Sequence, residues 1–174
     1  EWVHDPTALQ PRMEFSPVPV YKTWGAMEKL VNKGLVRNIG VCNFNTAGLR
    51  DILSFCKIPP AVLQIELHPY NQQELLVRFC KEEGIVVTAF SPLGSSSYVE
   101  LDMAKKTDSC MLEEVVKKIA DKKGKTPAQI LLRWGIERNM SIIPKSTKVH
   151  RMKENINILD FELTKEEMEQ INTL

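Results

Sequence analysis

The 174-residue chain has little excess charge and no long apolar segment. Its formal net charge of +1 provides no broadly basic surface for nucleic acid or anionic lipid. The apolar runs, such as 85–87, are far shorter than the roughly 20 residues that cross a bilayer. The first residues lack the charged and apolar zones of a signal peptide, and the chain does not begin with Met. We therefore expect no nucleic-acid or membrane partner, and a natural N-terminus that lies further upstream.

Cysteine and glycine are scarce, and their spacing argues against two common kinds of site. The four cysteines are Cys42, Cys56, Cys80 and Cys110. They form no Cys-x-x-Cys pair and have no metal-like spacing with the three histidines, so we expect free thiols, a cytoplasmic protein and no metal site. The eight glycines include no Gly-x-Gly-x-x-Gly turn, so a glycine loop is not how this chain would hold a dinucleotide.

The sequence does have an alternation of amphipathic helices and short apolar strands. Apolar residues at helical spacing predict helices over 20–33, 46–55, 73–83 and 111–123, and others that begin near Thr126, Val149 and Thr164. Apolar runs predict strands over 36–41, 61–65, 85–90 and 141–143. Thr126 before Pro127, and Thr164 with Glu167, are typical of helix starts. Such alternation indicates an α/β fold with parallel strands and right-handed crossovers.

Polar or unusual residues stand where the predicted strands end. They are Cys42 and Asn43 on the first strand, Gln64, Glu66 and His68 on the second, Phe90 and Ser91 on the third, and Lys145 and Ser146 on the fourth. In a parallel α/β barrel these ends and the loops that follow form the active site. For any single residue, the alternative is that it satisfies backbone groups where a strand turns. The long polar segment 91–107 is typical of a functional loop.

The segment 142–155 combines a strand end, hydroxyls, cations and the start of a helix. Lys145, Ser146, Thr147 and Arg151 suit a phosphate group there, whereas the simpler alternative is a capped helix with solvated charges. Four strands do not close an eight-stranded barrel, for which about 250 residues are typical. The chain is therefore either an open doubly wound sheet or about half of a barrel.

Four segments, in this order, resemble the C-terminal part of the aldo-keto reductase family. They are Gly40-Val41-Cys42-Asn43-Phe44-Asn45, Gln64-Ile65-Glu66-Leu67-His68-Pro69-Tyr70, Thr88-Ala89-Phe90-Ser91-Pro92-Leu93-Gly94 and Ile143-Pro144-Lys145-Ser146. The resemblance implies a (β/α)8 TIM barrel, with residues 1–174 forming roughly the C-terminal half of its single domain and the N-terminal strands absent. It also implies an NADPH-dependent oxidoreductase that reduces aldehydes and ketones to alcohols.

The resemblance further implies which residues contact NADP(H). Asn43 and Gln64 should bond the nicotinamide carboxamide, with Cys42 in a position usually held by serine, and Phe90 should stack on the nicotinamide ring. Ser91, Leu93 and Ser95 should line the pyrophosphate. The 2′-phosphate should meet Lys145, Ser146, Thr147 and Arg151, while the adenine should meet Glu154 and Asn155. Two cations at the 2′ position favour NADP over NAD, because a free ribose hydroxyl would leave them unpaired.

The family's chemistry needs an Asp, a Tyr, a Lys and a His, and all but the histidine lie upstream of the matched part. The segment His4-Asp5-Pro6-Thr7 resembles the family's His-Trp-Pro segment, which makes His4 the catalytic histidine; a frayed terminal histidine is the alternative. The general acid would then be missing, so we expect no activity in the 174 residues alone. For the intact protein we expect a monomer that acts on a small-molecule carbonyl substrate. The alternatives are a non-catalytic NADPH-binding scaffold or regulatory subunit, and a half-barrel whose exposed sheet edge self-associates.

Overall fold

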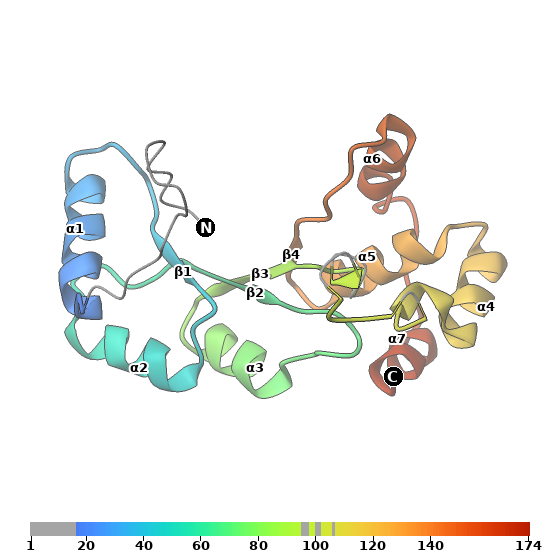
Figure 1. Cartoon of the computed structure of the whole chain (residues 1–174), viewed down its shortest axis with the longest axis horizontal. Coiled ribbons are helices and arrows are strands. Elements are labelled where there is room, and N and C mark those ends of the chain that lie inside the picture. The colour runs from blue at the N-terminus through green and yellow to red at the C-terminus, as the bar shows by residue number, and fades with distance from the viewer. Residues whose placement is uncertain (1–16, 95–97, 100–101, 106) are drawn as a thin grey trace.

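The computed structural model describes residues 17–94, 98–99, 102–105 and 107–174 of the chain. The elements, in order, are α1 (Val20–Asn32), β1 (Gly40–Cys42), α2 (Thr46–Phe55), β2 (Val62–Glu66), α3 (Glu74–Glu82), β3 (Val86–Phe90), the 3-10 helix η3 (Cys110–Leu112), α4 (Glu114–Lys123), α5 (Pro127–Glu137), β4 (Ser141–Ile142), α6 (Val149–Ile156) and α7 (Lys165–Asn172) (Figure 1). In the described residues the strands form one parallel sheet in the order β1-β2-β3-β4. Consecutive strands are therefore neighbours, as they are in a parallel barrel, and the expected α/β class is confirmed.

One face of this sheet is covered by helices and the other is open. Leu63 and Ile65 of β2 and Val87 and Ala89 of β3 are buried in one core cluster with side chains of α2, α3, α4 and α5. The alternate residues of the same strands point the other way, and Val86 is 52% exposed there. Successive side chains of a strand point to opposite faces, so Gln64 and Thr88 lie on the open face.

The predicted helix starts at Thr126 and Thr164 are confirmed. Each threonine is the N-cap of a complete capping box, with Gln129 as its partner on α5 and Glu167 as its partner on α7. On α2, Asn45 is the cap and accepts a hydrogen bond from the Gly48 N–H at 2.9 Å. Because a cap satisfies backbone N–H groups within one turn, its signal is local and can be read from the sequence.

Two predicted boundaries are wrong. The first strand begins at Gly40 and not at residue 36, because its pairing with β2 starts with Gly40 opposite Val62. Just before this pair, the Ile39 carbonyl accepts a hydrogen bond from the Ala61 N–H at 2.8 Å. The helix predicted over 111–123 is two helices. The 3-10 helix η3 ends at Leu112, and the extended backbone of Glu113 separates η3 from α4. Both departures depend on tertiary pairing that a local apolar pattern does not contain.

A methyl group added at Gly40 is expected to destabilise the sheet. A Cβ there would lie 2.5 Å from the Val62 carbonyl oxygen, a backbone atom that cannot swing aside. We expect Gly40→Ala to lower the free energy of unfolding by about 1–3 kcal/mol, measured as a lower urea midpoint. Gly25→Ala on α1 is the control, because no described atom lies within 4 Å of its added Cβ, and a gain of about 0.5–1 kcal/mol is expected in a helix. Equal losses in both variants would contradict the close approach.

Candidate functional site

The carboxyl ends of β1, β2 and β3 bring together residues from three distant parts of the sequence. Cys42 pairs in register with Gln64, and Gln64 pairs with Thr88 on its other side. The Asn43 N–H continues the ladder and donates to the Gln64 carbonyl at 2.9 Å. Phe90 lies two residues further along β3, opposite Glu66. The residues that the resemblance assigns to the nicotinamide therefore come from one end of the sheet, with Gln64 exposed on the open face.

The backbone turns sharply just after two of these strands. Asn43 and Ser91 have φ angles of 57° and 48°, in the left-handed region that few non-glycine residues adopt. After Ser91, a turn is closed by the Gly94 N–H, which donates to the Ser91 carbonyl at 2.9 Å. Strained conformations of this kind cluster at ligand sites, where the surrounding structure holds them.

Leu93 and Ser91 lie on this turn, but they differ in what surrounds them. The Leu93 side chain packs against the main core cluster, so only its backbone is suited to approach a pyrophosphate. Ser91 is half-buried. The other residue expected near the pyrophosphate, Ser95, and the expected catalytic residue, His4, lie outside the described residues.

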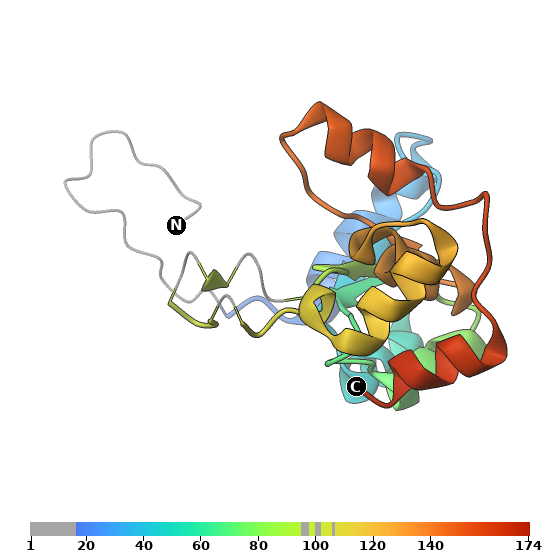
Figure 2. The ribbon, with the colours of Figure 1, turned by 90° about the vertical axis from the view of Figure 1, so that its right-hand side faces the viewer.

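The segment after β4 forms a second group beside α6. Lys145, Ser146 and Asn155 line a pocket of about 600 Å³ that is otherwise mostly apolar, with Ile142 and Met152 among its walls. This volume lies within the range of small-molecule sites. Figures 1 and 2 show α6 standing away from the body of the molecule, next to α5. The structure thus places three of the residues expected at the adenosine end of the cofactor around one cavity.

The start of α6 is shaped by Ser146. Its hydroxyl accepts a hydrogen bond from the Lys148 N–H at 3.1 Å, which fixes the turn between β4 and the helix. Lys145, Thr147 and Arg151 are exposed, whereas Glu154 is half-buried. Further along, the Gln129 side chain of α5 donates to the carbonyls of Glu154 and Asn157 at 3.2 and 2.9 Å. This amide fastens one end of α6, while its cation-bearing start remains open to a ligand.

Glu66 and His68 were expected only as polar residues of a strand end, and Tyr98 was assigned no role. The Tyr98 hydroxyl donates to Glu66 Oε2 at 2.9 Å, and His68 Nε2 lies 3.3 Å from Glu66 Oε1. The hydrogen bond to Glu66, together with desolvation, raises the pKa of the Tyr98 phenol. The sequence signal for this group was the position of Glu66 and His68, two and four residues after Gln64. Tyr98 is 32 residues from Glu66, so no local pattern could have joined them.

The Tyr70 hydroxyl donates a hydrogen bond to Glu113. Burial, followed by this hydrogen bond, raises the pKa of the Tyr70 phenol. The hydrogen bond joins the segment after β2 to Glu113, the N-cap residue of α4.

The four cysteines all lie in the described part of the chain and are free; Cys42 is exposed at the strand end and Cys80 and Cys110 are buried. Among the residues that the structure describes, no three His, Cys, Asp or Glu side chains are grouped as they would be around a metal ion. Within the same residues, no helix is both long and apolar enough to cross a membrane.

The chain is similar to known proteins over almost all of its length. It is 46% identical over 163 residues to 4-dihydromethyl-trisporate dehydrogenase of Mucor mucedo, covering 93% of this chain and 51% of that protein. It is 44% identical over 162 residues to an NADPH-dependent D-xylose reductase of Meyerozyma guilliermondii, covering 92% and 51%. The chain thus spans about half the length of these curated relatives.

Solved structures give the same result for the fold. The aldose reductase of Schistosoma japonicum superposes with a TM-score of 0.81 at 40% identity, over 91% of this chain and 48% of that one. An aldo-keto reductase from a deep-sea metagenome library superposes with a TM-score of 0.80 at 36% identity, over 88% and 54%. The sequence model of the Aldo/keto reductase family matches residues 2–174. The chain therefore belongs to the aldo/keto reductase family, and its four parallel strands with their helices have the TIM-barrel fold of that family.

Proposed function

We propose that the intact protein carrying this chain is an NADPH-dependent oxidoreductase that reduces aldehydes or ketones to alcohols. The observation that carries the proposal is the meeting of Asn43, Gln64 and Phe90 at one end of the sheet, in the family's order. Relatives named as NAD(P)H-dependent and NADPH-dependent D-xylose reductases support the same chemistry. In this proposal residues 1–174 form the C-terminal half of a single barrel domain, acting as a cytoplasmic monomer.

The residues of this chain fit a bound dinucleotide. The amide side chains of Asn43 and Gln64 can both donate to and accept from a carboxamide, and the Phe90 ring offers a face for stacking. At the other end, Lys145 and Arg151 provide cations, and Ser146 and Thr147 hydroxyls, for a 2′-phosphate. Glu154 and Asn155 are proposed to contact the adenine. Nicotinamide supplies the hydride when the cofactor is bound, while these side chains bind and orient it.

The same proposal leaves catalysis to residues outside the described part. His4 is proposed as the histidine that orients the substrate carbonyl, and the tyrosine, lysine and aspartate are proposed to precede this chain. We therefore expect the 174-residue chain to give no NADPH-dependent carbonyl reduction, because the general acid is missing. The intact protein should consume NADPH when an aldehyde is added, measured as loss of its absorbance.

Two outcomes would contradict these expectations. An intact protein that binds NADPH but oxidises it with none of several aldehydes or ketones would refute the reductase and favour a non-catalytic scaffold. Measurable turnover by the purified 174-residue chain would refute the expectation that this chain lacks the general acid. Light scattering checks the expected monomer separately.

A further inference from the structure

The side chain of Glu66 connects the end of β2 to the chain that follows β3. One carboxylate oxygen, Oε2, accepts the Tyr98 hydroxyl at 2.9 Å, and the other, Oε1, lies 3.3 Å from Nε2 of the buried His68. The Glu66 side chain is only 26% exposed, so these bonds are partly shielded from water. Hydrogen bonds to a carboxylate are about twice as strong as neutral ones, which makes this a firm point of attachment.

The path of the chain explains what this attachment holds. Glu66 is the register partner of Phe90, and the next residue, Leu67, donates its N–H to the Phe90 carbonyl at 3.2 Å. The chain leaves the sheet at Phe90, passes through the turn at 91–94 and meets Glu66 again at Tyr98, eight residues later. The described part of the turn therefore lies between two points fixed on the same end of β2.

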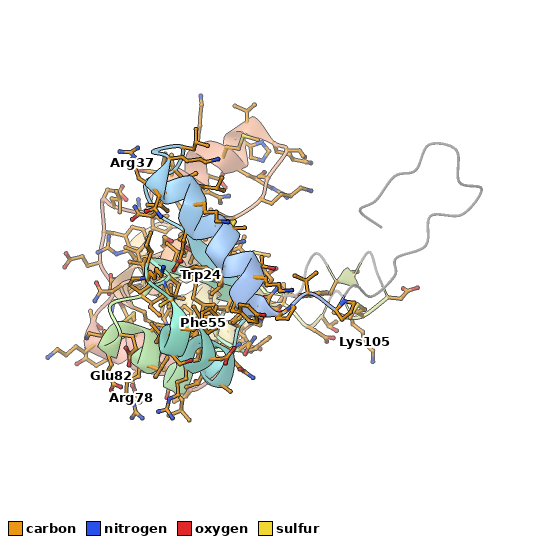
Figure 3. All side chains as sticks on the ribbon, turned by 90° about the vertical axis from the view of Figure 1, so that its left-hand side faces the viewer. Trp24, Arg37, Phe55, Arg78, Glu82 and Lys105 are labelled. Carbon is orange, nitrogen blue, oxygen red and sulfur yellow. The ribbon has the colours of Figure 1, made fainter. Side chains whose placement is uncertain are left out.

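After Tyr98, the described residues 102–105 lie away from the body of the molecule (Figure 3). Figure 3 shows Lys105 well away from the packed helices, and Figure 2 shows the segment that carries it from the other side. The Tyr98–Glu66 bond thus lies at the base of this segment, where the chain comes from the turn at 91–94. Within the described residues of this segment, the Lys105 N–H donates to Asp108 and the Met103 N–H donates to the Tyr98 carbonyl, so both bonds stay within the segment.

We propose that Glu66 and Tyr98 are positioning residues for the cofactor, because their hydrogen bond holds the turn at 91–94 where Ser91 and the Leu93 backbone meet the pyrophosphate. The inference rests on the proposed function, since it assigns these residues to the same cofactor site. Neither residue touches the reacting atoms.

Tyr98→Phe removes one oxygen atom and tests the bond in the intact protein. We expect NADPH to dissociate about tenfold faster and KM for NADPH to rise, while KM for the carbonyl substrate is unchanged. Tyr21→Phe is the matched control, because Tyr21 is an exposed tyrosine of α1 whose ring packs on Phe55 of α2. An unchanged NADPH dissociation rate, or equal effects of the two variants, would overturn the proposal.

Amide exchange in the cofactor-free protein supplies a readout that does not need NADPH. The Gly94 N–H closes the turn, so its exchange should quicken about tenfold in Tyr98→Phe and remain unchanged in Tyr21→Phe. Glu66→Gln, which keeps an acceptor but removes the charge, should give a smaller increase than Tyr98→Phe. The two changes together should have less than the product of their separate effects, since they weaken one shared hydrogen bond. If the double variant increased the Gly94 exchange rate by the product of the two single effects, the two residues would act independently and the proposal would be refuted.

The two experiments separate failure of the inference from failure of the proposed function. If the wild-type protein binds no NADPH, the proposed function fails and the cofactor part of this inference fails with it. If it binds NADPH but the Gly94 exchange rate does not change in Tyr98→Phe, the inference alone fails. If Tyr98→Phe exchanged the Gly94 amide faster but released NADPH at the wild-type rate, the bond would stabilise the turn without positioning the cofactor, and the inference would also be overturned.

Discussion

Replacing Lys145 by methionine is expected to weaken NADPH binding by about 10- to 100-fold and to leave NADH binding nearly unchanged. Lys145 is an exposed residue three positions after β4, and it lines the same pocket as Ser146 and Asn155. A charge-assisted hydrogen bond to phosphate contributes about 1.5–3 kcal/mol, and about 1.4 kcal/mol corresponds to tenfold in affinity. NADH carries no 2′-phosphate, so removing the ammonium takes no hydrogen bond from bound NADH.

A second lysine of the same helix region provides the control. Lys153 is an exposed residue of α6 that is not assigned to the cofactor, so Lys153→Met changes the net charge equally. Methionine keeps most of the apolar stem of lysine, which limits any loss of packing. Fluorescence titration of the intact protein with both cofactors measures the effect. Equal weakening by the two variants, or equal loss of NADH and NADPH, would place the 2′-phosphate elsewhere.

Much of this site follows from the sequence because its signals are local. The predicted strand ends bring Cys42 beside Gln64 and Phe90 beside Glu66, as expected for consecutive parallel strands. Once the strands are known to be parallel and adjacent in order, their carboxyl ends must lie at one edge of the sheet. The placement of the strand-end residues needed no side-chain detail.

What the sequence could not provide is contact between distant side chains. The Tyr98 hydroxyl bonds Glu66, 32 residues away in the sequence, because the chain returns to the end of β2. No periodic pattern of residues predicts that return. Leu93 was predicted to line the pyrophosphate, and the sequence pattern did not indicate that its side chain packs against the core, which leaves its backbone for that role. The fold supplies the orientation of such residues, whereas the pattern supplies only their place along a strand.

The stability of the C-terminal helix α7 is expected to depend on one ionised carboxylate. Glu167 has a side chain only 6% exposed, and it accepts hydrogen bonds from Lys123 at 2.8 Å, the Thr164 N–H at 2.8 Å and Lys122 at 3.0 Å. Burial alone would raise the pKa of this carboxyl, but these three donors outweigh it and lower the pKa from 4.5 to about 2. The capping box of α7 and its contact with α4 thus depend on the same two oxygens.

The sign of the pH dependence follows from that shift. A carboxyl whose pKa is lower in the folded state stabilises the fold above its unfolded pKa, here 4.5, and this contribution is lost as the pH falls towards about 2. The shift is equivalent to about 2–3 kcal/mol, allowing for the exposed side chain of Lys122. We therefore expect Glu167→Gln to lower the free energy of unfolding by this amount near neutral pH, with the difference from wild type vanishing by about pH 2.

The choice of glutamine isolates the charge from the cap. Glutamine at this position can still complete a capping box, as Gln129 does on α5, so the helix start is preserved while the two lysines lose their anion. Glu169→Gln, an exposed residue of the same helix, is the control and should change little at any pH. Urea unfolding from neutral to acidic pH makes the measurement. A loss that stayed constant across that range would mean that Glu167 acts through packing, and a loss that disappears on acidification would mean that its charge holds α7 against α4.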